Sequence, residues 1–230
     1  MKWLNLMADD NFKSSHYVDR VTGQVHRSYT YKRRPAIRLV LTSKLAEQYT
    51  GYMLIEKDLR SSLVWLDEIE NRHLSDEKIK QYNHFNPDRE NFNLVKGLFV
   101  ALLTFYGKCF TQCEGRRVKL ERVQIDPKYH VLHDECMKYR HNFAAHSGAK
   151  KLEKAEIALV YPAKIRNKVE FKIFKELDQP DFFMAKSGEV SLRELLGHVR
   201  EKVLAKMDKL HEKIVNEEIL PNAEKYFSRK

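Results

Sequence analysis

The sequence predicts a mainly α-helical protein: a bundle of four to five helices, with a short β extension before it and a β-hairpin inserted before the last helix. Long segments repeat apolar residues at intervals of three and four, which is the period of a helix that is buried on one side. Helix-start signals precede these segments. The shorter period of strands is confined to residues 1–41 and to a segment near 155–174.

Residues 1–41 predict short strands. Strand-forming residues are grouped in four runs, 16–18, 21–25, 28–31 and 37–41. A turn is expected at Gly23. We expect residues 1–43 to form an extension and not an independent domain.

Two long helices are predicted next. Ser43 can cap a helix over about 44–73. Its apolar stripe has a period close to 3.5 and consists of Leu45, Tyr49, Tyr52, Leu59, Leu63, Leu66 and Ile69. A short helix is expected over about 76–83. Asn86 and Pro87 then start a helix that runs to about 113, and its apolar middle predicts the central helix of the bundle.

A third long helix is predicted over about 127–147, because Asp126 and Pro127 repeat the same start signal. The period then changes, and two strands are expected at 155–161 and 169–174, with a possible third at 182–184.

Ser191 and Glu194 form a capping box that opens a last long helix, which runs to about 218. The helical domain is therefore expected over 44–219, with the β insertion at about 154–185. Residues 220–230 are expected to be a C-terminal tail.

The composition indicates a basic protein of the cytoplasm. The net charge is +10 and the isoelectric point is about 9.4, which favours a polyanionic partner, nucleic acid ahead of a membrane surface. No apolar run is as long as a membrane span, and no secretion signal is visible. Three cysteines, an odd number, suit a reducing compartment. We expect no membrane association.

Three groups of basic residues are candidates for RNA phosphate contacts. They are expected in loops or near helix ends, where such contacts form easily. The groups are Lys32, Arg33 and Arg34; Arg116 and Arg117; and Lys150 and Lys151.

The most informative stretch is 139–148, at the end of the third predicted long helix. Arg140 is followed by the polar His141 and, six positions later, by His146. An arginine stays charged and can hold a phosphate through two parallel N–H bonds. A histidine can gain or lose a proton near neutral pH. His146 also continues an apolar stripe of its helix, so a purely structural role is the alternative.

This pattern resembles the Arg-(polar)-x4-His signature of HEPN-superfamily ribonucleases, including the Ala-His-Ser sequence around the histidine. Residues 106–111, followed by Gly115 and Arg116, also look like the end of the second helix in abortive-infection-type members. The resemblance covers about 44–219. It implies a small helical bundle, a homodimer with its two motifs face to face, and a toxin or phage-defence effector that an antitoxin protein balances.

The resemblance also implies a chemistry: metal-independent RNA cleavage by attack of the 2′-hydroxyl, with no cofactor or metal. His146 would act as base or acid, and Arg140 would hold the phosphate and neutralise developing charge. His141 would orient the phosphate or act as a second acid or base. The substrate contacts would include Asn142, Ser147, Lys150, Lys151 and the other basic groups.

Two alternatives remain open from the sequence. One is a non-catalytic HEPN module that binds RNA, a nucleotide or a partner protein. The other is a zinc site, for which the candidate ligands are Cys109, Cys113, His130, His133 and Cys136. The glycines show no phosphate-loop spacing, which disfavours ATP hydrolysis and dinucleotide chemistry.

Overall fold

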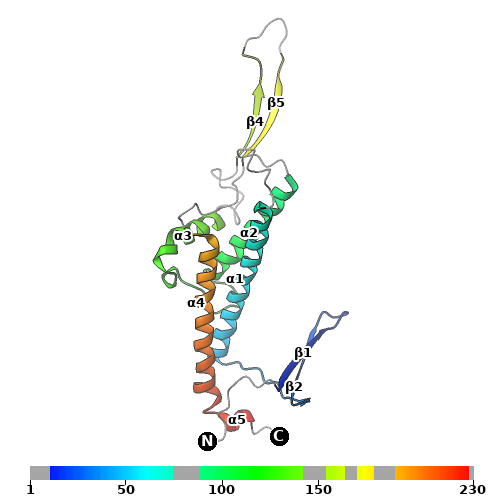
Figure 1. Cartoon of the computed structure of the whole chain (residues 1–230), viewed down its shortest axis with the longest axis vertical. Coiled ribbons are helices and arrows are strands. Elements are labelled where there is room, and N and C mark those ends of the chain that lie inside the picture. The colour runs from blue at the N-terminus through cyan, green and yellow to red at the C-terminus, as the bar shows by residue number, and fades with distance from the viewer. Residues whose placement is uncertain (1–10, 75–88, 142–153, 164–169, 179–189, 228–230) are drawn as a thin grey trace. The chain divides into compact units, whose positions relative to one another are not determined.

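The computed structural model describes residues 11–74, 89–141, 154–163, 170–178 and 190–227 (Figure 1). The chain divides after Ser43 into an N-terminal unit and a larger unit that contains the helices. The mainly α class that the sequence predicts is confirmed. The predicted short helix at 76–83 and the possible strand at 182–184 lie outside the described residues.

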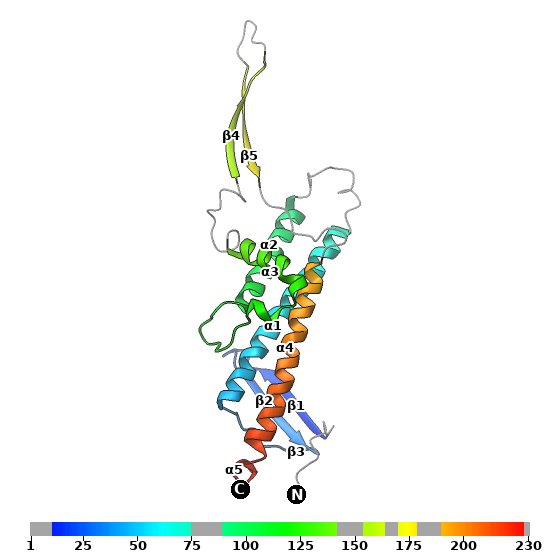
Figure 2. The same cartoon turned by 90° about the vertical axis from the view of Figure 1, so that its left-hand side faces the viewer.

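Helix α1 (Lys44–Leu74) packs along both α2 (Arg89–Cys109) and α4 (Leu192–Lys213), as Figures 1 and 2 show. α1 matches its predicted bounds. α2 ends at Cys109 and not near 113. The hydrogen bonds that follow Cys109 belong to a turn and no longer to the helix. Both the Phe110 N–H and the Thr111 hydroxyl donate to the Gly107 carbonyl, at 3.1 and 2.8 Å.

Helix α3 (His130–Tyr139) follows a 3-10 turn at Pro127–Tyr129, which places Pro127 at the first helical position. At residues 140–141 the helix widens to π-type winding. The remainder of the helix predicted over 127–147 lies outside the described residues.

The predicted capping box of α4 is confirmed. The Glu194 N–H donates to the Ser191 hydroxyl at 3.1 Å, and the Ser191 N–H donates to the Glu194 carboxylate at 2.8 Å. Beyond Lys213 the chain continues as a π-helix (Ile214–Ile219), and α5 (Ala223–Phe227) follows it. The helix is thus continuous to the predicted end near 218, but its last part is wound more widely.

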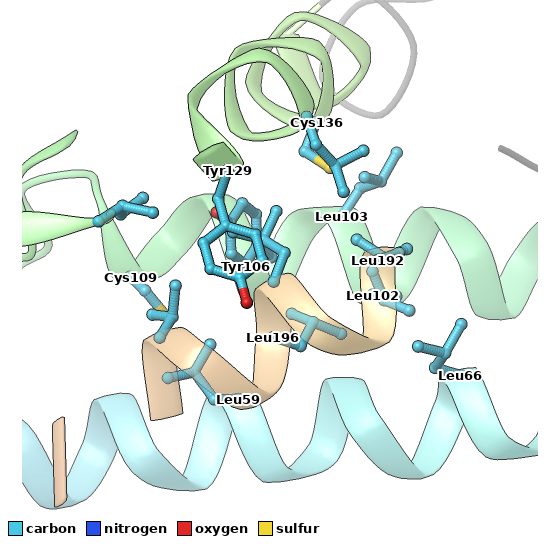
Figure 3. Packing of buried hydrophobic residues seen from close by; sticks show 14 of the residues in the cluster. Leu59, Leu66, Leu102, Leu103, Tyr106, Cys109, Tyr129, Cys136, Leu192 and Leu196 are labelled. Carbon is cyan, nitrogen blue, oxygen red and sulfur yellow. The ribbon is translucent and has the colours of Figure 1, made fainter. Parts of the chain in front are cut away.

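The core is formed where α1, α2, α3 and α4 meet (Figure 3). Its fully buried side chains include Leu59, Leu66, Leu102, Tyr106 and Leu196. The residues at the start of the predicted α1 stripe, such as Leu45 and Tyr49, are only half-buried, whereas Ile55 is fully buried. Residues 90–109 are long and apolar enough to cross a membrane by length and composition alone. Here the apolar side chains Phe99, Leu102, Leu103 and Tyr106 belong to the bundle core.

The N-terminal unit is an antiparallel sheet in the order β1 (Phe12–Val18), β2 (Val25–Tyr31) and β3 (Arg34–Pro35). Gly23 lies in the β1–β2 turn with a left-handed φ of 69°, as the sequence predicts. Residues 21–24 form this turn and not a strand. The strand predicted at 37–41 is also wrong: pairing ends after Pro35, and the Ala36 N–H makes the last bond to the sheet, at 2.8 Å from the Tyr29 carbonyl.

The predicted hairpin insertion is confirmed as β4 (Lys154–Val160) and β5 (Lys172–Asp178), which pair antiparallel. β5 begins three residues later than the predicted strand at 169–174, and residues 164–169 lie outside the described part of the chain.

Candidate active site

Arg140 lies at the C-terminal end of α3, where the winding of the helix widens. Its backbone N–H donates to the carbonyls of Cys136 and Met137. A π-type turn inside a helix occurs often at functional sites. Of the predicted catalytic residues, Arg140 is half-buried and His141 is exposed. The third predicted catalytic residue, His146, lies outside the described residues, as do the predicted substrate contacts Asn142, Ser147, Lys150 and Lys151.

The side chain of Arg140 lies across the α2 backbone at Gly107. A Cβ atom at position 107 would stand 2.9 Å from Arg140 Cγ, 3.0 Å from Cδ and 3.2 Å from Nε. These separations are shorter than van der Waals contacts between carbon atoms allow. Arg140 therefore occupies this position because residue 107 has no side chain. The C-terminal ends of α2 and α3 therefore meet at Gly107 and Arg140.

Arg140 differs from the other arginines of the helical unit in its partners. Each other arginine whose side chain the structure describes there pairs with at least one carboxylate. The pairs are Arg60–Glu56, Arg72–Glu68, Arg116–Asp58, Arg117–Glu47, Arg122–Asp134, Arg193–Asp67, Arg193–Glu70 and Arg200–Glu56. Within the described part of the chain, the Arg140 guanidinium has neither an ion-pair nor a hydrogen-bond partner.

This arrangement suits the binding of an anion. A guanidinium has five N–H donors, keeps its charge at all relevant pH values and matches phosphate geometry. A half-buried cation without a counter-ion has lost part of its hydration, and an anionic ligand offsets that cost. Arg140 is therefore the best candidate for a phosphate contact among the described arginines of the helical unit.

Three histidines of α3 and α4 have partners within the fold. His133 is 4% exposed, and its Nδ1 lies 2.7 Å from the Tyr106 hydroxyl. Burial lowers the pKa of His133, and it raises the pKa of Tyr106 well above its usual range. His130 bonds to the Ile125 carbonyl, and His198 accepts a bond from the Asp126 N–H. These three histidines are therefore engaged within the fold.

The structure corrects the prediction for Arg116. Its side chain is only 5% exposed and cannot reach an RNA chain. It pairs with Asp58, itself 2% exposed, at 3.4 Å, and also donates to the Lys108 carbonyl and to Cys113 Sγ. Lys57 and Lys108 lie on the same carboxylate, at 3.1 and 3.6 Å. The sequence analysis did not identify Asp58 as a buried residue that needs a cationic partner. Its position offered a signal, because Asp58 lies three residues after the buried Ile55 and so falls on the same side of the helix.

The other described basic residues that the sequence predicted as RNA contacts have no described contact with Arg140. Arg117 is exposed and pairs with Glu47 at 2.6 Å. Lys32, Arg33 and Arg34 belong to the N-terminal unit, where they form the β2–β3 turn and the start of β3.

The cysteines are free thiols. Burial raises the pKa of both Cys109 and Cys136 to about 12, so neither is a reactive thiolate at neutral pH. Among the described residues, no group of three or more histidine, cysteine or acidic side chains is placed to hold a metal ion. The candidate ligands for zinc therefore do not form a cluster in this part of the chain.

Gly107 provides a sharp test of the Arg140 position. Gly107→Ala should change the stability by no more than about 1 kcal/mol in either direction, because the gain in helix propensity of alanine over glycine is opposed by the displacement of Arg140 that the new Cβ requires. The same change should displace the Arg140 side chain and lower any activity that depends on it by at least tenfold. Thermal unfolding and an RNA-cleavage assay measure the two effects. Gly97→Ala, in the same helix with open space around its Cβ position, is the matched control and should change stability only. Full activity in Gly107→Ala would contradict the role of this contact.

No protein-family model, no curated protein and no solved structure matches this chain.

Proposed function

We propose that this protein is a metal-independent endoribonuclease of the HEPN type, with Arg140 as the phosphate-binding residue and His146 as the acid or base. The single observation that carries the proposal is the half-buried guanidinium of Arg140. It lies on Gly107 and lacks the carboxylate that every other arginine of the helical unit has, among those whose side chains are described. It belongs to the same motif as His141 and His146.

The proposed reaction uses the substrate's own nucleophile. A base removes the proton from the 2′-hydroxyl, and the 2′-oxygen forms a bond to phosphorus while the bond from phosphorus to the 5′-oxygen breaks. An acid donates a proton to the departing 5′-oxygen, which leaves a 2′,3′-cyclic phosphate and a 5′-hydroxyl. Arg140 would neutralise the charge that grows on the non-bridging oxygens. His146, with His141 as the second candidate, would transfer the protons.

The proposal includes a homodimer, in which each chain supplies one copy of the motif. In-line transfer needs both an acid and a base, and two copies of the motif around a two-fold axis would supply them. The interface would lie beside residues 140–147. In this setting the protein would be a cytoplasmic toxin or phage-defence effector held in check by an antitoxin. A protein that is monomeric in sedimentation at working concentration, and cleaves RNA in that state, would contradict the shared site.

The chemical groups at the ends of the RNA fragments test the proposed mechanism. The purified protein should cleave RNA to products with 2′,3′-cyclic phosphate ends, and RNA methylated at the 2′-oxygen or DNA of the same sequence should resist. Mass spectrometry of the fragments identifies the ends. Cleavage of the methylated RNA or of DNA would require a nucleophile other than the 2′-hydroxyl. Binding of RNA without cleavage would identify the non-catalytic module.

A further inference from the structure

The N-terminal sheet places aromatic and basic side chains on one face. Directly opposed residues of an antiparallel pair share a face, and alternate residues along a strand return to it. Phe12 pairs with Tyr31 and Tyr31 with Arg34, while Ser14 pairs with Tyr29 and His16 with Arg27. One face of the sheet therefore carries Phe12, His16, Arg27, Tyr29, Tyr31 and Arg34.

Of these side chains, Phe12, His16, Arg27 and Arg34 are exposed, and the Tyr29 and Tyr31 rings are half-buried. The Phe12 and Tyr31 rings lie with centroids 4.5 Å apart, and Phe12 is 62% exposed. The opposite face carries a different set, in which Ser15 and Ser28 share a hydrogen bond of 2.7 Å and Tyr17 stacks on His26.

The unit is strongly basic. Residues 11–43 contain seven lysines and arginines and one acidic residue, Asp19, which gives a net charge of +6. Asp19 is occupied in the β1–β2 turn, where its carboxylate accepts hydrogen bonds from the backbone N–H groups of Val21 and Thr22. These bonds lower the pKa of Asp19 and keep it ionised. Among the described residues, no basic side chain of this unit forms an ion pair with Asp19.

The β2–β3 turn contains two cations, Lys32 and Arg33, and the backbone is strained at both. Lys32 and Arg33 are the two loop residues, and their φ values of 47° and 65° are left-handed. Tight turns of this type favour Asn-Gly, because residues with larger side chains are strained there. Lys32 also lies over the Tyr31 ring, at 5.3 Å from its centroid.

We infer that this face of the N-terminal sheet, Phe12, His16, Arg27, Tyr29, Tyr31 and Arg34, binds single-stranded RNA. Unpaired bases can stack on the Phe12, Tyr29 and Tyr31 rings, since every base has an aromatic face. Arg27, Arg34 and the turn residues Lys32 and Arg33 supply positive charge for the backbone phosphates. Paired bases are not free to stack on these rings, so a duplex is a poor ligand. The inference goes beyond the proposed cleavage and does not depend on it.

The test measures binding of the full chain to a fluorescent 20-nucleotide 2′-O-methyl oligouridine, which cannot be cut by 2′-oxygen attack. Removal of one stacking ring or one phosphate-binding cation should weaken binding about tenfold. Tyr31→Leu and Arg27→Gln should therefore each bind about tenfold more weakly than wild type. The matched controls on the opposite face, Tyr17→Leu and Lys13→Gln, should change affinity by less than about threefold. The duplex of the same strand with its complement should bind at least tenfold more weakly.

A second variant separates binding from folding. Lys32→Asn with Arg33→Gly relieves the left-handed backbone at both positions, so the sheet should be at least as stable as in wild type. Binding should nevertheless weaken, and the log–log salt slope should fall by about 1.4, because each of the two cations would neutralise one phosphate and each such contact on a single strand contributes about 0.7.

Equal losses in variants of both faces, or equal affinity for the duplex, would overturn the inference. So would wild-type affinity in the turn variant. Because the probe cannot be cut, this result is independent of the cleavage test: a protein that binds the probe through this face but leaves RNA intact keeps this inference and loses the proposed reaction.

Discussion

Replacing either Arg140 or His146 by alanine should lower RNA cleavage by about two to four powers of ten. Loss of one acid–base group costs about 10²–10⁴ in rate, and loss of one group that stabilises transition-state charge costs about 10²–10³. If the two residues form one catalytic unit, the double variant should be little worse than either single variant. Single-turnover cleavage of a labelled RNA measures these rates.

The control for this pair is Arg122→Ala. Arg122 is also an arginine of the helical unit, but it is neutralised by two hydrogen bonds to Asp134, at 2.7 and 2.8 Å. Its loss should change cleavage by less than about threefold. Binding of uncleavable RNA should survive His146→Ala better than Arg140→Ala, because only the arginine is proposed to hold the phosphate. Undiminished cleavage in both single variants would end the nuclease proposal.

Arg116→Leu should destabilise the helical unit by about 3 kcal/mol. Removing one partner of a buried ion pair leaves an uncompensated charge and typically costs about 3–5 kcal/mol. Lys57 and Lys108 remain near Asp58, so the lower end of that range is expected. Urea unfolding followed by circular dichroism of the helices gives the free energy of unfolding.

The matched variant removes both charges. Arg116→Leu combined with Asp58→Leu should recover much of the lost stability, because a buried pair can be replaced by apolar side chains at little cost. Wild-type stability in the single variant would show that Asp58 does not need Arg116, and the assignment of Arg116 to the core would then be wrong.

The sequence predicted the helices well because their apolar stripes and start signals are local. The capping box at Ser191 and the proline start at Pro127 are both found in the structure. The strand predicted at 37–41 is wrong because a strand also needs a partner, and pairing is not local information. For the same reason, the turn expected at Gly23 is found, but the sequence did not show that it extends over residues 21–24, which were predicted as part of a strand run.

The candidate site was predicted only in part. The pattern of Arg140, His141 and His146 is visible in the sequence, but the contact between Arg140 and Gly107 joins positions 33 residues apart and has no local signal. Arg116 and Arg117 look alike as neighbours, yet one is buried on Asp58 and the other is exposed on Glu47. The partner of each arginine, which decides whether it is available to RNA, depends on tertiary packing.

The most direct test of the central proposal is cleavage of total RNA in excess EDTA by the purified wild-type protein, side by side with His146→Ala prepared in the same way. A reaction that uses the 2′-hydroxyl, Arg140 and His146 needs no metal ion, so the chelator should not slow the wild type, and His146→Ala should leave the RNA intact. Wild-type cleavage that stops in EDTA and returns with added magnesium or zinc would contradict the proposal, as would equal cleavage by both proteins.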